Sequence, residues 1–124
     1  MFPVTSMVAA LAAAALVFLS ISVSLRRKRV GVRLGLSDDP TLMRRIRAQG
    51  NFIEYVPLAL IVLALAEYRH APAVLLWTIA GLLVVGRGLH YAGIVTATTP
   101  LSAPGMVGTY GALLVGAATL LFAG

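Results

Sequence analysis

Four long apolar runs constrain this chain more than any other feature of its sequence. They cover residues 4–25, 52–66, 73–95 and 103–123, and the first and last runs contain no charged residue. A helix needs about 20 predominantly apolar residues to cross a bilayer. Lipid offers no partner to backbone polar groups, so each span must be a helix or part of a closed barrel. The alternation of barrel strands is absent, and we therefore predict an all-α integral membrane protein with a four-transmembrane-helix bundle.

The composition agrees with lipid as the solvent. Of the 124 residues, 60% are hydrophobic and 11% are charged, whereas soluble domains are about 25% charged. This length fits one domain, residues 1–124. The chain has no cysteine, which excludes disulfides, thiolate metal sites and a protein thiol nucleophile. Its two histidines are too few to suggest a metal site, and we expect no nucleic-acid partner.

Proline and aspartate mark the expected helix ends. We predict helices at about 4–25, 40–68, 72–95 and 103–123, with a basic loop at 26–39. Asp39 before Pro40 fits an N-cap followed by proline at the first helical position. Pro72 is expected to open the third helix in the same way. The second helix would be about 40 Å long at 1.5 Å per residue, so its first turns should project from the membrane.

The basic residues indicate an orientation. Eight of the ten Lys and Arg residues lie between Arg26 and Arg47, and loops rich in these residues stay in the cytoplasm. We therefore place the first loop in the cytoplasm and both termini on the opposite side. The first apolar run has no basic residue before it and a basic cluster after it. This order favours a retained helix over a cleaved signal peptide.

A polar stripe precedes the second apolar run, in the stretch "RAQGNFIEYVP" of residues 47–57. At about 100° per residue, one face of a helix would carry Arg44, Arg47, Asn51, Glu54, Tyr55 and Leu58. An ionisable group such as Glu54 costs about 2.5–3.5 kcal/mol inside a membrane, and it usually faces the bundle interior with a partner. The stripe is then either a binding surface or a structural device. In the structural alternative, Glu54 pairs with an arginine of the stripe or of the third helix, and the amides join helices.

A second polar cluster lies within the third apolar run, in "GRGLHYAG". Arg87 is followed by His90 and Tyr91 at i+3 and i+4, on the same helix face. Arg87 is open to three interpretations: a snorkelling side chain, a counter-ion for Glu54, or an anion-binding group. Close helix approach is expected at the small residues of the third and fourth helices: Gly86, Gly88, Gly105, Gly108, Gly111 and Gly116.

These residue types together favour a ligand with several kinds of polar group. Arginines clamp carboxylates bidentately, Asn51 and Gln49 can pair with amides, and Glu54 can receive an ammonium group. Glutathione carries carboxylates, amides, an α-amino group and a thiol. A nearby positive charge such as Arg87 lowers the pKa of a thiol, and the thiolate is the nucleophile.

The stretch "RAQGNFIEYVP" resembles the signature of the MAPEG family, the membrane-associated proteins in eicosanoid and glutathione metabolism. Arg47, Asn51, Glu54, Tyr55 and Pro57 match the family pattern R-x-x-x-N-x-x-E-Y-x-P. The resemblance extends over the whole chain, and "GRGLHYAG" is most similar to small bacterial members. It therefore implies a bacterial inner membrane location and a homotrimer of four-helix protomers.

The resemblance also implies where glutathione binds, between neighbouring subunits near the cytoplasmic face. Arg47, Asn51, Glu54 and Tyr55 would come from one subunit. Arg26 and Gln49 would come from its neighbour, and Arg87 matches an arginine that lines the site. One departure concerns catalysis. The leukotriene synthase branch has an arginine after the third helix, whereas no Lys or Arg follows Arg87 here.

We therefore predict a glutathione-dependent membrane enzyme, a microsomal-type glutathione S-transferase or peroxidase, that acts in detoxification on lipophilic electrophiles. Thiolate stabilisation would fall to Arg87, His90 or Tyr91, and Tyr55, Leu58 and Ile94 would contact the lipophilic second substrate. One alternative is a glutathione- or lipid-binding relative without turnover. Another is a small four-helix exporter, which the absence of a carboxylate in the first run disfavours.

Overall fold

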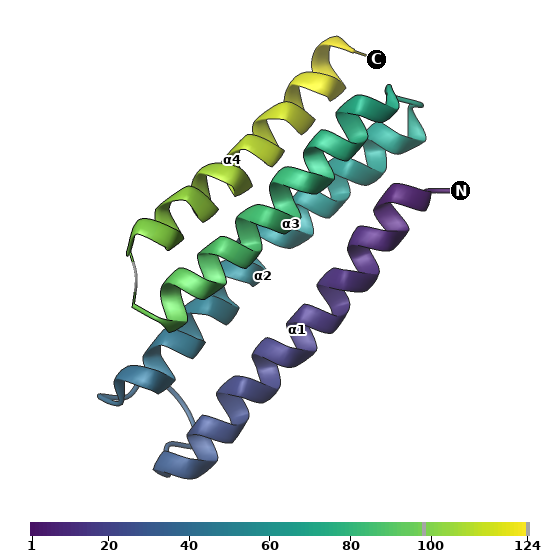
Figure 1. Ribbon diagram of the computed structural model, residues 1–124. Coiled ribbons are helices and arrows are strands. Elements are labelled where there is room, and N and C mark those ends of the chain that lie inside the picture. The colour runs from purple at the N-terminus through teal and green to yellow at the C-terminus, as the bar shows by residue number, and fades with distance from the viewer. Residues whose placement is uncertain (98, 124) are drawn as a thin grey trace.

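In the computed structural model, residues 1–97 and 99–123 are described, and they form four helices. These are α1 (Pro3–Val30), α2 (Pro40–Tyr68), α3 (Ala73–Val95) and α4 (Thr99–Phe122), which lie side by side in one bundle (Figure 1). Each of the four is long and apolar enough to cross a membrane. The predicted all-α, four-helix architecture is confirmed. The start of α1 and the end of α4 lie at the same end of the bundle.

The end of α1 differs from the prediction. The expected loop at 26–39 begins later, because α1 continues to Val30 and ends at Gly31, whose φ of 75° is a left-handed conformation that glycine adopts without a steric penalty. Arg27, Lys28 and Arg29 occupy the last helical turn, where cations interact favourably with the helix dipole. The start of the basic cluster therefore marks the end of the apolar run and not the end of the helix.

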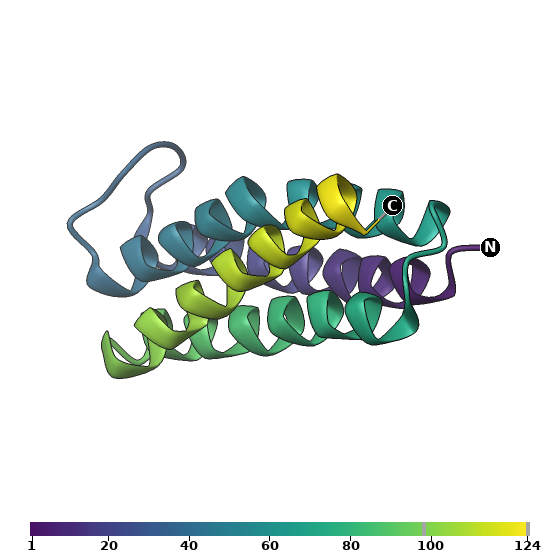
Figure 2. The ribbon, with the colours of Figure 1, turned by 90° about the horizontal axis from the view of Figure 1, so that it is seen from above.

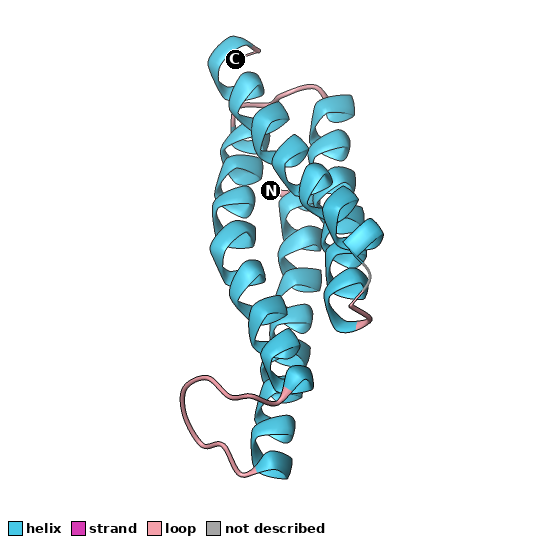
Figure 3. Ribbon diagram, turned by 90° about the vertical axis from the view of Figure 1, so that its left-hand side faces the viewer, coloured by secondary structure: helices cyan, strands magenta, loops and turns pink. Residues whose placement is uncertain are grey.

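The start of α2 agrees with the prediction. Asp39 is the N-cap, and its side-chain oxygen accepts a hydrogen bond from the Leu42 amide at 2.8 Å. Where α1 ends and α2 begins, these two helices extend beyond the end of α3 and the start of α4. The loop that joins α1 to α2 projects from this end of the bundle (Figures 2 and 3). The helix continues through Pro57 to Tyr68.

The starts of α3 and α4 lie one residue later and four residues earlier than predicted. Pro72 is the N-cap of α3 and not its first helical residue. Pro104 lies inside the helix that begins at Thr99. Pro100 instead occupies the first turn, where the missing N–H costs nothing because that donor has no intrahelical acceptor.

The core is built mainly from α2 and α3, and α1 contributes more buried apolar residues to it than α4 does. Its most deeply buried side chains are Leu42, Leu63, Ile79, Leu83 and Thr109. Large apolar side chains also cover the outside of all four helices, including Val17, Ile61, Val85 and Leu114, which are 56–69% exposed. Lipid makes such exposure inexpensive, so packing of small residues and hydrogen bonds must hold the helices together.

Glycines bring the backbones of α3 and α4 into direct contact. A Cβ atom added to Gly86 would lie 2.8 Å from the Gly105 carbonyl oxygen, and one added to Gly105 would overlap the backbone of His90. Close approach at Gly86 is therefore confirmed. The same expectation for Gly88 is wrong, because a Cβ there would meet nothing within 4 Å.

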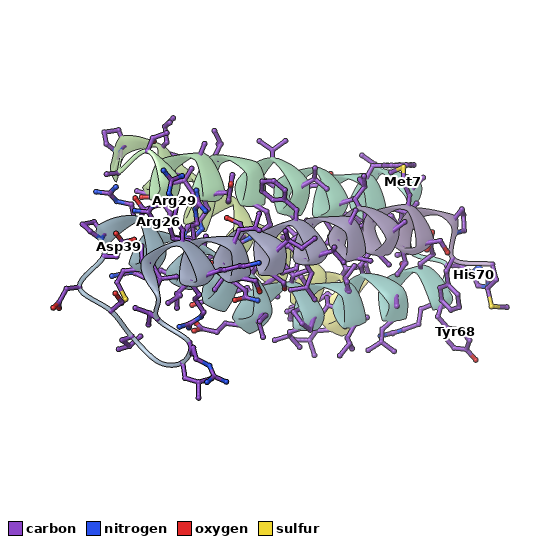
Figure 4. The ribbon with its side chains drawn as sticks, turned by 90° about the horizontal axis from the view of Figure 1, so that it is seen from below. Met7, Arg26, Arg29, Asp39, Tyr68 and His70 are labelled. Carbon is purple, nitrogen blue, oxygen red and sulfur yellow. The ribbon has the colours of Figure 1, made fainter. Side chains whose placement is uncertain are left out.

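Helix α1 is fastened to α2 by polar contacts near both of its ends. At the start of α1, the Glu67 carboxylate accepts hydrogen bonds from the backbone amides of Val4 and Thr5, both at 2.9 Å. These amides belong to the first turn of α1, where they have no intrahelical acceptor. At the opposite end, Arg26 of α1 is paired with Asp39 at the start of α2 (Figure 4).

We predict that Gly105→Ala lowers the free energy of unfolding by about 1–3 kcal/mol, the usual cost of overpacking. The added methyl group must push α4 away from His90. Unfolding of the detergent-solubilised protein by a denaturing detergent measures the change. Gly81→Ala is the matched control, since a Cβ there meets nothing within 4 Å. Equal stability of the two variants would contradict the importance of this contact.

Candidate functional site

Arg87 is the centre of a polar cluster inside the bundle. One guanidinium nitrogen, Nη1, donates to Asn51 Oδ1 at 2.6 Å and to Thr109 Oγ1 at 3.4 Å. The other, Nη2, lies 3.4 Å from Nδ1 of the buried His90. The structure therefore brings together Asn51, Arg87 and His90, three residues predicted for the site, and ties α2 to α3 and α4.

Thr109 is a member of this cluster that the sequence analysis missed. Its hydroxyl is fully buried and donates to the Gly105 carbonyl at 3.0 Å, which leaves its lone pairs free to accept from Arg87. The signal in the sequence is the position of Thr109, four residues after Gly105 and therefore on the same face of α4. That face is turned toward Arg87 by the packing of α4 against α3 at Gly105.

Arg87 still has donor capacity left over. Its Nε is buried, and within residues 1–97 and 99–123 it has no hydrogen-bond partner. The guanidinium carbon lies 6.0 Å from the centre of the Phe52 ring, a distance at which a cation is attracted to the ring face. The charge is thus held by one short hydrogen bond to Asn51, by longer contacts to Thr109, His90 and the Met106 sulfur, and by an aromatic face.

Glu54 does not have the interior position that we expected. Its side chain is exposed on the outer face of α2, beside Ile53 and Leu58, which are 52% and 54% exposed. The alternative ion pair with Arg47 or Arg87 is not formed. Arg87 contacts Asn51 instead, and the one ion pair within the described part of the chain joins Arg26 and Asp39. Helix α2 therefore turns Asn51 inward and Glu54 outward.

The two residues expected from a neighbouring subunit have partners within this chain. Arg26 holds Asp39 bidentately, with Nε–Oδ2 and Nη2–Oδ1 distances of 2.8 and 2.9 Å. Gln49 donates to Ser20 Oγ at 2.9 Å. Both contacts join α1 to α2 near the basic end of the bundle.

The tyrosines predicted for the site lie on different sides of the bundle. The ring of Tyr55 contacts Tyr110 of α4 edge-on at 5.8 Å. The ring of Tyr91 contacts Phe18 of α1 in the same manner at 5.7 Å. Tyr91 lines a cavity together with Arg87, so these two residues share a wall as expected.

The three residues expected to contact a lipophilic substrate do not share a cavity. Ile94 lines a cavity of about 240 Å³ with Arg44 and Arg47. Leu58 is exposed, and Tyr55 is half-buried against α4. Ile94 therefore lies close to Arg47 of the stripe, in a cavity that Tyr55 and Leu58 do not line.

We predict that Asn51→Ala lowers the free energy of unfolding by about 1.5–3 kcal/mol, the usual value of a hydrogen bond to a charged group. Asn51→Asp keeps an acceptor for Arg87 and should stay closer to the unmodified protein. Denaturing-detergent titration of both variants measures the difference. A stability of Asn51→Ala equal to that of the unmodified protein would argue against this hydrogen bond.

We also predict that Asp39 stays ionised in mild acid. Hydrogen bonds from Arg26 and from the Leu42 amide lower the pKa of this carboxyl from 3.8 to about 2. A lowered pKa means that the stabilising contribution is full above the ordinary pKa and is lost as the pH falls through about 2. Carboxyl carbon NMR measures the titration midpoint, which should rise in Arg26→Gln. An unchanged midpoint would disprove the ion pair as the cause.

Comparison with known proteins agrees with these features. The model of the MAPEG family matches residues 5–122. The chain is also 30% identical over 103 residues to Inner membrane protein YecN of Escherichia coli K12, covering 82% of this chain and 79% of that protein. YecN of Escherichia coli O6:H1 strain CFT073 matches to the same extent. No solved structure gives a significant match.

The four apolar spans and these inner-membrane relatives confirm the predicted location as integral to a bacterial inner membrane. The family match covers all four helices. The polar stripe of α2 and the arginine cluster of α3 both fall within it. The chain therefore belongs to the MAPEG family.

Proposed function

We propose that this MAPEG protein is a glutathione-dependent membrane transferase that conjugates glutathione to lipophilic electrophiles or reduces lipophilic peroxides. Glutathione would arrive from the cytoplasm and the second substrate from the bilayer. A site at the boundary between the two gives both of them access. The proposal includes a homotrimer, in which the outer face of α2 is covered by a neighbouring subunit.

The observation that carries the proposal is the exposure of Glu54 on an apolar helix face. Its neighbours Ile53 and Leu58 are apolar and exposed, and the described residues supply it with no ion pair. A carboxylate that faces lipid in this way is costly. Another subunit and a ligand with a positive group would remove that cost, and the α-amino group of glutathione is such a group.

The other polar groups of the stripe suit the remaining parts of glutathione. Arg47 is exposed less than two turns before Glu54 and has no hydrogen bond or ion pair within the described ranges, so it is available for a carboxylate. Asn51 lies between them and is already bound to Arg87. We rest the proposal on Arg47, Asn51, Glu54 and Tyr55. Arg26 and Gln49 would have to exchange their present partners to take part.

Thiol activation is assigned to Arg87 in this proposal. The guanidinium is the one cation deep among α2, α3 and α4 in the described part of the chain, and its Nε has no partner there. A thiolate near it would be stabilised by charge. His90 is within 3.4 Å and acts through Arg87, while Tyr91 is on the wall that faces α1.

The test is glutathione binding to the detergent-purified protein at neutral pH, with the ultraviolet absorbance of the thiolate followed at the same time. We expect binding with a thiolate signal. The affinity should fall about tenfold or more in Arg47→Ala and in Glu54→Gln, since each variant removes a charge-assisted contact. Arg33→Ala is the matched control, because Arg33 is an exposed arginine of the α1–α2 loop, outside the stripe.

Each outcome decides between the hypotheses. A thiolate signal that is lost in both stripe variants and kept in Arg33→Ala supports the transferase. Binding without the signal would identify a non-catalytic glutathione-binding relative. Absence of binding at millimolar glutathione would overturn the proposal. In that case, loss of drug-gradient transport in Glu54→Gln would favour an exporter.

A further inference from the structure

Two adjacent cavities lie along the side of the bundle where α1 faces α3. The first, of about 450 Å³, is bounded by Ile21, Leu25, Val95, Arg44 and Arg45, and we call it the basic chamber. The second, of about 280 Å³, is bounded by Val8, Leu11, Ala15, Val84 and Gly88, and we call it the apolar chamber. Phe18 and Tyr91 line both chambers.

The way in which α1 is attached explains why space remains here. Its polar contacts lie toward its two ends, with Glu67 at one end and with Asp39 and Gln49 toward the other. Between these contacts, α1 carries a run of alanines at 12–15. Side chains this short cannot fill the space to α3, and Gly88 on the opposite wall adds none.

The basic chamber is suited to an anion. Arg45 Nη1 donates to the Ser22 carbonyl at 3.1 Å and keeps its other donors. Arg44 forms no ion pair within the described ranges. Asp39 interacts electrostatically with Arg45, but its carboxylate is already held by Arg26. None of the described residues that line the two chambers is acidic.

The apolar chamber is suited to a hydrocarbon chain. Aliphatic and aromatic side chains form its walls, and its one charged residue, Arg87, is bound to Asn51. Leu25 and Val8 mark the far ends of the two chambers and are 17 residues apart on α1. At 1.5 Å per residue this is about 25 Å, most of the roughly 30 Å hydrocarbon thickness of a bilayer.

We propose that the α1–α3 side of each protomer binds one anionic phospholipid. The phosphate lies in the basic chamber at Arg44 and Arg45, and one acyl chain passes Phe18 and Tyr91 into the apolar chamber. Basic pockets between transmembrane helices recognise anionic headgroups in this way. A soluble anion would leave the apolar chamber unused, and a zwitterionic lipid such as phosphatidylcholine would bring a positively charged ammonium group close to the two arginines. The site does not need Arg47 or Glu54, although Arg87 and Tyr91 line its apolar chamber, and lipid binding can be measured without glutathione.

The test compares lipid binding by native mass spectrometry of the purified protein. The probes are dioleoylphosphatidylglycerol, dioleoylphosphatidylcholine with the same chains, and glycerol phosphate as the headgroup alone. We expect one phosphatidylglycerol per chain, bound more tightly than phosphatidylcholine, and no binding of glycerol phosphate at the same concentration. Equal affinity for the two lipids, or equally tight binding of glycerol phosphate, would overturn the proposal.

Charge variants test the basic chamber. Arg44→Gln with Arg45→Gln should weaken phosphatidylglycerol binding about 25-fold, roughly fivefold for each basic group removed. Lys28→Gln with Arg29→Gln is the matched control, since it removes two exposed charges at the same end of the bundle, outside the chamber. An equal loss in the control would mean diffuse surface attraction and would overturn the site. If loss of the Arg45–Ser22 contact prevents the double variant from folding, Arg44→Gln alone replaces it in this test.

A filling variant tests the apolar chamber. Gly88→Leu places a side chain on the chamber wall, and a Cβ there meets nothing within 4 Å, so the protein should fold. It should weaken the binding of both lipids at least fivefold. Gly81→Leu is the matched control, on the same helix, equally free of contacts and outside the chamber. Lipid binding that is unchanged in Gly88→Leu would exclude the acyl chain from this cavity.

Discussion

The hydrogen bonds of Arg87 are the interaction on which the centre of the bundle depends. A guanidinium in apolar surroundings must find partners, and most of those available to Arg87 are on other helices. Asn51 of α2 and Thr109 of α4 supply oxygens, and His90 supplies a ring nitrogen. Because these partners come from three helices, the charge fixes how those helices face one another. Glycine contacts between α3 and α4 then allow the approach that these distances require.

Helix α1 is attached to the bundle in a different way. Contacts near its two ends fasten it to α2, and small side chains occupy its middle. In water, the resulting cavities would be a liability for stability. In a membrane, lipid chains are available to fill them, so a loosely packed side can be kept as a binding surface. The basic end places cations where such a lipid would carry its phosphate.

Much of the fold could be predicted from the sequence, because lipid forces hydrogen-bonded backbones into helices. The four helices, the Asp39 cap and the close approach at Gly86 followed from apolar length, proline position and residue size. Helix ends were less certain. The basic cluster at 26–29 marked where apolar character stops, but α1 continues to Gly31, because arginine and lysine are good helix formers. Similarly, the fourth apolar run begins at residue 103, but α4 begins at Thr99.

Helical periodicity was enough to show which residues share a face of α2, and the same residues carry the family signature. The directions in which those faces point follow from the packing of the helices. Asn51 turns inward to Arg87, whereas Glu54 turns outward. The two are three residues apart, which helical periodicity counts as one face, yet the bundle boundary passes between them. Periodicity fixes the angle between side chains on one helix, but the neighbouring helices that define inside and outside come from distant parts of the chain.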